Sequence, residues 1–228
     1  MARIKLADRS LPDYTRGEEV FNMVSHIAGG AFGVIVLATC VFKAAFCGGA
    51  RDVAGAAIYG VSMIVLYTMS SVYHGLMPPM AKKVFQVIDH CTIYLLIAGT
   101  YTPIALSGLM RLGAWYGWGM FGAIWALAAL GIVFNAIDLK RYTFFSQALY
   151  ILMGWCIVFT GRSAIRALTP AGFGWVLAGG ISYSVGAILY GIAGRGKRPH
   201  RYMHSVFHLF VVLGSVLQFF GIIFYLYG

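Results

Sequence analysis

The sequence predicts an all-α membrane protein, a seven-transmembrane helix bundle, from its composition and from the length of its apolar segments. Of its 228 residues, 60% are hydrophobic and 11% are charged, and the mean hydropathy is +0.80. Charged residues are about twice as common in soluble domains. The apolar stretches are too long for barrel strands and do not alternate, which indicates helices that satisfy their own backbone groups in lipid.

Seven segments have roughly the ~20 residues that a membrane-spanning helix needs. In order they are 22–46, 53–76, 84–108, 115–135, 143–163, 172–193 and 203–227. The breaks between them are short and polar: Gly48–Asp52, Pro78–Lys83, Arg111–Gly113, Asp138–Tyr142, Arg166–Pro170 and Gly194–Arg201. Residues 1–20 are polar and of mixed charge, which predicts a short cytoplasmic N-terminal segment and no cleavable signal peptide. Residues 21–228 then form the transmembrane domain.

Basic residues gather on one side of the predicted bundle. With the N-terminus inside, the cytoplasmic pieces hold twelve of the 17 Lys and Arg residues and the outer pieces hold five. This positive-inside bias predicts a cytoplasmic N-terminus and a C-terminus outside. The net charge of +10 is therefore assigned to membrane orientation and to anionic lipid head groups, and not to nucleic acid.

Ionisable side chains occur at one depth of this bundle. His74 ends the second segment, Asp89 opens the third, and His204 and His208 lie four apart at the start of the seventh. The predicted topology places all of them near the cytoplasmic face. Residues four apart share one helical face, so two imidazoles can bind one cation. Because ionisable groups are costly in lipid, such a set usually marks function.

His74 adds a third imidazole to this pair, and three protein ligands with one open position are typical of catalytic zinc sites. Neutral imidazole favours zinc, with copper, iron and nickel as alternatives. The four cysteines show no paired spacing, so thiolate ligands are not indicated. Asp89 is a candidate general base, because zinc lowers the pKa of bound water to about 7. The alternative interpretation is that these side chains are hydrogen-bonded polar groups at the membrane interface.

The other three of the six histidines are assigned different places. His26 and His90 also fall on the cytoplasmic side, where each is interpreted as a packing group or as a partner of a ligand. His200 is placed in the basic loop before the seventh segment.

Several short motifs are spread over essentially the whole chain. They are Gly17-Glu18-Glu19, Ser25-His26-Ile27-Ala28-Gly29-Gly30, Ser70-Ser71-Val72-Tyr73-His74, Ile88-Asp89-His90, Ala98-Gly99-Thr100-Tyr101-Thr102-Pro103, His204-Ser205-Val206-Phe207-His208 and Phe219-Phe220-Gly221. Together they resemble the hemolysin III family, the bacterial branch of the progestin and adipoQ receptor family.

This resemblance implies a seven-helix fold with zinc held by three histidines near the cytoplasmic leaflet. It assigns His74, His204 and His208 as zinc ligands and Asp89 as the residue that contacts the zinc-bound water. Ser70, one turn before His74, is a candidate hydrogen-bond donor to a substrate or ligand, and equally a small residue that eases helix packing. The chain lacks the acidic N-terminal cluster associated with calcium in the related alkaline ceramidases, which disfavours a ceramide substrate.

Three functions follow as hypotheses. The first is a zinc-dependent hydrolase of a lipid amide or ester, with Asp89 and Ser70 as the catalytic side chains. The second is a non-enzymatic sensor or regulator of membrane lipid homeostasis with structural zinc. The third, a pore-forming cytolysin, is disfavoured because a secreted pore former must stay soluble before insertion. Membrane lipids and a lipid-like substrate or ligand are the expected partners, the bacterial inner (plasma) membrane is the expected location, and the oligomeric state stays open.

Overall fold

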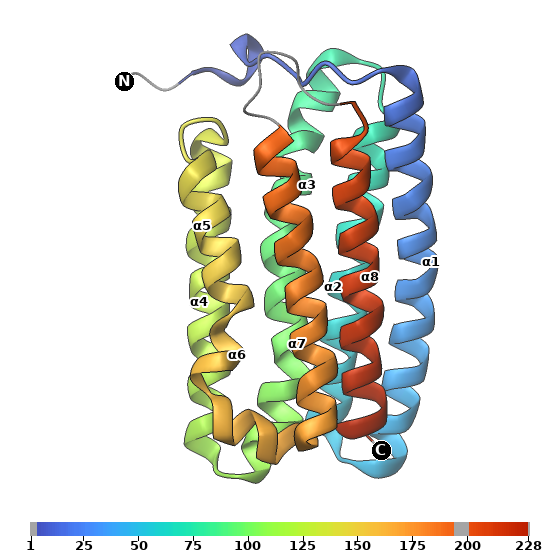
Figure 1. Cartoon of the computed structure of the whole chain (residues 1–228). Coiled ribbons are helices and arrows are strands. Elements are labelled where there is room, and N and C mark those ends of the chain that lie inside the picture. Colours follow the sequence, from blue (N-terminus) through green and yellow to red (C-terminus); the bar gives the residue numbers. More distant parts are fainter. Residues whose placement is uncertain (1–3, 194–200, 228) are drawn as a thin grey trace.

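All regular structure in the described residues is helical. The computed structural model describes residues 4–193 and 201–227. Its elements are η1 (Leu6–Asp8), α1 (Arg16–Cys47), α2 (Ala50–Gly75), α3 (Pro79–Pro103), η2 (Ile104–Gly108), η3 (Leu109–Arg111), α4 (Ala114–Asp138), α5 (Thr143–Gly154), α6 (Cys156–Phe159), α7 (Gly161–Ala193) and α8 (Met203–Tyr225). Figure 1 shows the long helices side by side in one bundle, with the marked N- and C-terminal ends at opposite ends of it.

Six helices of the described chain are long and apolar enough to cross a membrane, so this is an integral membrane protein. They are Arg16–Phe46, Ala50–Gly75, Pro79–Arg111, Ala114–Asp138, Gly161–Gly191 and Met203–Tyr225. These agree, to within a few residues at most ends, with six of the seven predicted segments. The fifth predicted segment, 143–163, is different, because it is divided among α5, α6 and the start of α7.

The predicted segment 143–163 is broken where a side chain of α3 enters its backbone hydrogen bonding. The Tyr101 hydroxyl donates to the Gly154 carbonyl at 2.8 Å and accepts from the Ile157 N–H at 2.9 Å. Trp155, between α5 and α6, has φ −93° and ψ 0° and is not helical. Insertion of a side chain into the i to i−4 ladder is a known cause of helix kinks. The chain therefore continues as two short helices at this level.

A second irregularity bends α7 at Thr169, whose φ of 64° and ψ of 163° are not helical. Pro170 follows, and a proline disfavours helical geometry in the residue before it. The Thr169 hydroxyl accepts from the Gly172 N–H at 3.4 Å, as a helix N-cap does. The straight part of α7 thus begins close to the predicted start at 172, and the preceding residues turn across the end of the bundle (Figure 1).

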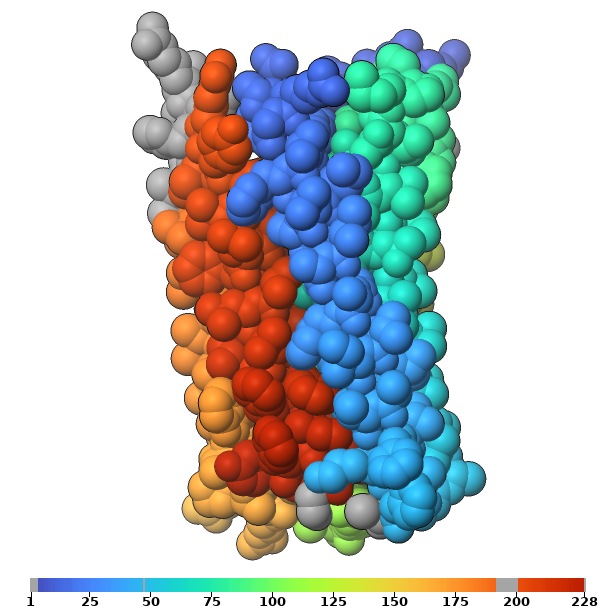
Figure 2. Space-filling model, turned by 90° about the vertical axis from the view of Figure 1, so that its right-hand side faces the viewer, coloured from blue at the N-terminus to red at the C-terminus, as the bar shows by residue number. Residues whose placement is uncertain are grey.

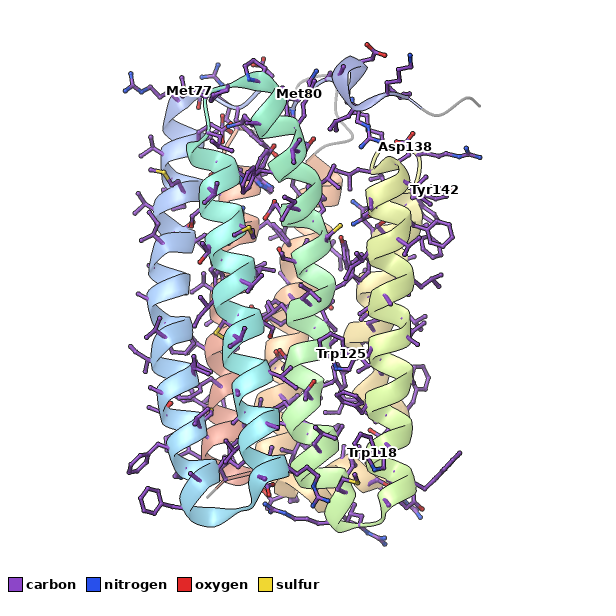
Figure 3. The ribbon with its side chains drawn as sticks, turned by 180° about the vertical axis from the view of Figure 1, so that it is seen from behind. Met77, Met80, Trp118, Trp125, Asp138 and Tyr142 are labelled. Carbon is purple, nitrogen blue, oxygen red and sulfur yellow. The ribbon has the colours of Figure 1, made fainter. Side chains whose placement is uncertain are left out.

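Helix α1 lies between α2 and α8 along one side of the bundle (Figures 1 and 2). Lipid offers no hydrophobic driving force between helices, so their association depends on close packing. A Cβ at Gly60 of α2 would lie 2.5 Å from the Cα of Leu37 in α1, so glycine is required for this approach. Between α3 and α4, the Trp125 indole N–H donates to the Thr102 hydroxyl at 3.1 Å (Figure 3). Buried helix α3 thereby connects the two sides of the bundle.

Residues 4–15, here called the N-terminal strap, lie across the end of the bundle where α8 begins (Figure 1). The Asp138 carboxylate at the end of α4 accepts from the Ile4 N–H at 3.2 Å and lies 3.8 Å from the Arg9 guanidinium. Arg9 also donates to the Ile137 carbonyl at 3.2 Å. These contacts fix the strap over the bundle end before the chain enters α1.

Candidate metal centre

Three imidazoles from two helices converge beneath the N-terminal strap. His74 lies in the last turn of α2, and His204 and His208 lie in the first two turns of α8. The Nε2 atom of His204 is 3.3 Å from Nε2 of His74 and 3.1 Å from Nε2 of His208. One nitrogen from each ring lies within 4.8 Å of the other two. The three residues predicted to share one metal are thus adjacent in space.

The first turn of α1 fixes where α8 begins. Thr15 and Glu18 form a capping box, in which the Thr15 N–H donates to the Glu18 carboxylate at 2.8 Å. The other oxygen of that carboxylate accepts from the Tyr202 N–H at 2.7 Å. Tyr202 is the N-cap of α8 and has φ 62°, a left-handed conformation that costs a non-glycine residue about 1–2 kcal/mol. The Glu18 carboxylate therefore binds the starts of both α1 and α8. This contact fixes the position of His204 along the axis of the bundle.

Acceptor groups on α1 orient two of the three rings. The Glu19 carboxylate lies 2.6 Å from Nδ1 of His74. Nδ1 of His208 faces the Asn22 carbonyl at 3.3 Å, and the Asn22 side chain accepts from the Ser205 hydroxyl at 2.6 Å. A carboxylate and a carbonyl only accept hydrogen bonds, so Nδ1 carries the proton in both rings. A neutral ring in this tautomer presents its Nε2 lone pair to the cluster.

Three ring nitrogens that lie close to one another can share one cation. A proton on Nε2 of His204 can serve either His74 or His208, but not both, and the buried Nδ1 of His204 has no hydrogen-bond partner. Tetrahedral zinc with Zn–N bonds of about 2.0–2.1 Å holds its nitrogen ligands about 3.3 Å apart. The observed separations of 3.1 and 3.3 Å match that spacing. The donor type, these two separations and the outer hydrogen bonds of His74 and His208 therefore fit zinc, whereas Nδ1 of His204 has no outer partner.

Two aromatic rings cover His204. Tyr14 of the N-terminal strap stacks on it with centroids 5.1 Å apart and planes 13° apart, and Tyr190 of α7 contacts it at 5.1 Å. Burial and the neighbouring Tyr190 raise the pKa of the Tyr14 phenol well above its usual range, so this group stays neutral at physiological pH. A ring-covered site has a lower local dielectric, which strengthens electrostatic interactions inside it.

Asp89 and Ser70 lie beside the three rings. Both side chains are buried. Nδ1 of His90 lies 3.8 Å from the Asp89 carboxylate. Ser70 is one turn before His74, so these two side chains share one face of α2. Asp89 is not part of the group whose donor atoms all lie within 4.8 Å of one another, so it stands outside the three-nitrogen set.

The remaining histidines occupy different positions. The His26 ring stacks on His208 with centroids 3.6 Å and planes 11° apart, and neither of its nitrogens has a hydrogen-bond partner. Nδ1 of His90 donates to the Gln86 carbonyl at 2.8 Å. Both rings pack beside the site, as the sequence interpretation expects. His200 lies outside the described residues.

Sequence reasoning missed the groups that orient the candidate ligands, namely Glu19, Asn22 and Ser205, and the covering ring of Tyr14. A signal for the first two was present: polar residues recur every three or four positions from Glu19 to His26, at the start of an apolar helix. A polar face on a membrane helix indicates partners inside the bundle. Tyr14 gave no such signal, because it precedes the helix.

The chain matches known proteins along most of its length. The family described as Haemolysin-III related matches residues 14–219. Hemolysin-3 of Bacillus cereus is 39% identical over 208 residues, which is 91% of each chain. The Hemolysin-3 homolog of Bacillus subtilis (strain 168) is 36% identical over 212 residues, covering 93% of this chain and 96% of that one. Monocyte to macrophage differentiation factor of Homo sapiens is 26% identical over 180 residues, covering 75% and 69%. No solved structure gives a significant match.

Proposed function

The chain belongs to the haemolysin III-related family, and from that membership we propose that it is a zinc protein that crosses a bacterial inner membrane seven times. Helices α5 and α6 together form the fifth and shortest crossing in this proposal. The opposite positions of the two chain ends support an odd number of crossings (Figure 1). The excess of basic residues on the side of the N-terminus supports a cytoplasmic N-terminus. The two Bacillus relatives support a bacterial membrane.

The observation that carries the zinc proposal is the convergence of three imidazoles, with Nε2 of His74 and Nε2 of His208 both facing Nε2 of His204. Neutral imidazole with a fixed tautomer is the state in which histidine binds zinc. Zinc, when bound, supplies a Lewis acid that polarises a carbonyl and makes water more acidic.

The best-supported activity is hydrolysis of a lipid amide or ester. Asp89 is the buried carboxylate beside the metal ligands, and as a general base it takes a proton from the attacking water. Ser70 shares a helical face with His74, where its hydroxyl can donate a hydrogen bond to a substrate or ligand. Tyr14 and Tyr190 cover His204, which favours approach of a substrate from the bilayer rather than from the strap side.

Metal content of the detergent-purified full-length protein tests the zinc site. About one zinc per chain is expected, as for a three-histidine site. The His204→Ala/His208→Ala variant should lose it while retaining its helical circular dichroism. His90→Ala is the matched control, because His90 lies beside the site without joining the cluster, and it should retain zinc. Wild-type protein purified without chelators and found free of metal would contradict the site.

A lipid panel with the zinc-loaded protein tests the enzymatic part. Turnover of at least one amide or ester class is expected, and Asp89→Asn should abolish it while leaving zinc content and thermal stability close to wild type. If the zinc-loaded wild type hydrolyses no lipid class, the hydrolase proposal is rejected and the zinc proposal stands.

One observation favours structural zinc in a lipid sensor as the second candidate. The ligands join the end of α2 to the start of α8, two helices that are distant in sequence, so a metal here would also stabilise the bundle. In that case, removing zinc lowers the unfolding temperature. Asp89→Asn then changes stability only as far as it changes zinc content, and no lipid is hydrolysed by either protein.

A further inference from the structure

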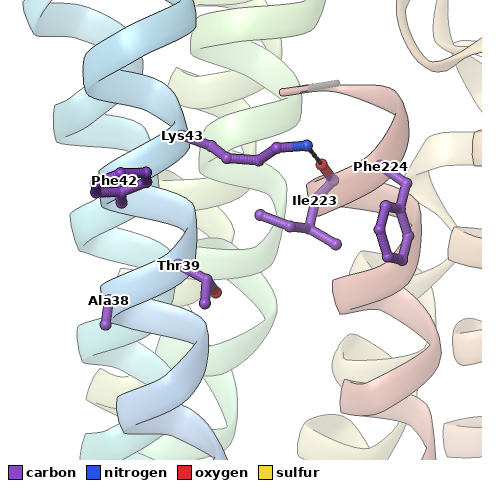
Figure 4. Close-up of a pocket in the computed structure, with 6 residues that line it drawn as sticks. All are labelled: Ala38, Thr39, Phe42, Lys43, Ile223 and Phe224. Carbon is purple, nitrogen blue, oxygen red and sulfur yellow. Dashed lines mark hydrogen bonds between the residues drawn. The ribbon is translucent and has the colours of Figure 1, made fainter.

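A groove lies between α1 and α8 near the ends of these helices that are remote from the histidine cluster (Figure 4). It is lined by Ala38, Thr39, Phe42, Lys43, Ile223 and Phe224. Its walls are almost entirely carbon, and Phe42 and Phe224 are 65% and 60% exposed on the bundle surface. The Thr39 hydroxyl donates to the Ile35 carbonyl of its own helix at 2.7 Å. The ammonium of Lys43 is therefore the polar group available to an occupant.

Lys43 does not extend along its own helix to the water. Its side chain crosses the groove to α8, where the ammonium donates to the Ile223 carbonyl at 3.0 Å and lies 5.9 Å from the centre of the Phe224 ring (Figure 4). Ile223 lies in the last turn of α8, where carbonyls lack partners within the helix. The contact fixes the ammonium at one end of the groove.

None of the ion pairs in the described part of the chain involves Lys43, so no acidic side chain there neutralises its positive charge. An ammonium has three donors, and one of them is used on Ile223. Two donors and a full positive charge are left at the mouth of an apolar groove. A positive charge near the membrane surface attracts an anionic lipid head group.

We propose that this groove binds one anionic phospholipid from the leaflet opposite the histidine cluster. Its phosphate accepts from the Lys43 ammonium, and one acyl chain lies between Phe42 and Phe224 toward Ala38. The surface of a membrane helix is covered by lipid, and the apolar walls suit an acyl chain. The unneutralised ammonium selects a head group with net negative charge over a zwitterionic one. This site is separate from the metal centre and does not depend on its chemistry.

Native mass spectrometry of the full-length protein in detergent tests the proposal, with phosphatidylglycerol and phosphatidylcholine of identical acyl chains as probes. One added charge contact near the surface corresponds to about fivefold tighter binding of the anionic lipid. Lys43→Met should abolish this preference, and Lys43→Arg should keep it. Ala38→Trp fills the groove and should weaken binding of both lipids while the Lys43 contact to α8 is retained.

Arg162→Met is the matched control, because it removes one exposed positive charge at the same end of the bundle without lining the groove. It should leave the lipid preference unchanged. Three results would overturn the proposal: no preference in the wild type, a preference that survives Lys43→Met, or an equal loss in Arg162→Met. Competition by soluble glycerol phosphate at the same concentration would show that the acyl chain makes no contribution, and would also overturn it.

Discussion

The contact between Glu19 and His74 allows a quantitative test of how α1 controls the metal centre. The carboxylate lies 2.6 Å from Nδ1 of His74, and the distance to the Lys82 ammonium is 2.8 Å. Replacing Glu19 by Gln keeps an acceptor opposite Nδ1 but removes its charge. Replacing Glu19 by Ala removes both.

Outer partners of metal-bound histidine typically contribute 10–100-fold to metal affinity. We expect zinc to bind about tenfold more weakly to Glu19→Gln and about 100-fold more weakly to Glu19→Ala. These losses correspond to about 1.4 and 2.7 kcal/mol, close to the range of about 1.5–3 kcal/mol for hydrogen bonds to charged groups. The cause is a His74 ring that is less basic in the first variant and free to rotate in the second.

Zinc affinity is measured by competition with a chromogenic chelator in detergent. Lys82→Met is the control, since it removes the other partner of Glu19 and leaves the contact to His74 in place; its zinc affinity should stay within about twofold of wild type. If both Glu19 variants bind zinc as tightly as wild type, the orientation of His74 does not depend on α1, and the tautomer argument for the site fails.

Three further predictions concern packing and cover. Tyr101→Phe leaves the carbonyl and N–H at the α5–α6 break unpaired, and should lower the free energy of unfolding in mixed micelles by about 1–3 kcal/mol; an unchanged value would mean that the break does not depend on this hydroxyl. Gly60→Ala should cost about 1–3 kcal/mol by forcing α1 from α2, whereas Gly119→Ala, with open space at its Cβ, should not destabilise; equal melting temperatures would refute the steric argument. Tyr14→Ala should speed zinc loss to a chelator by about threefold to tenfold through lost ring stacking, and Tyr14→Phe should not.

The long helices were predictable because apolar length is a local property. The predicted fifth segment, 143–163, shows where that reasoning ends. Its composition suits a continuous helix, but the Tyr101 hydroxyl, more than fifty residues away in sequence, takes up its backbone groups. The bend at Thr169 is different, because the neighbouring Pro170 predicts a break in the helix there. Only the size of the bend could not be predicted from the sequence.

The ligand set could be proposed from sequence because His204 and His208 share a helical face and His74 falls at the same depth. The resemblance to the hemolysin III family is confirmed by the match over residues 14–219. The roles of Glu19 and Asn22 could not be assigned, since a polar face on a helix does not reveal which neighbour it meets. Zinc, and the roles of the ligands and Asp89, stay predictions.

The contacts of α1 with α8 have a consequence for biosynthesis. Helix α1 is made first and α8 last, yet Glu18 and Asn22 find their partners on Tyr202 and Ser205. Until the final helix enters the membrane, Glu18 and Asn22 lack these partners, although Glu19 can already face His74 of α2, and exposed polar groups in lipid are unstable. A nascent or truncated chain that ends before Met203 would therefore present a recognisable defect to membrane quality-control proteases. Completion of the metal centre would coincide with the loss of that defect.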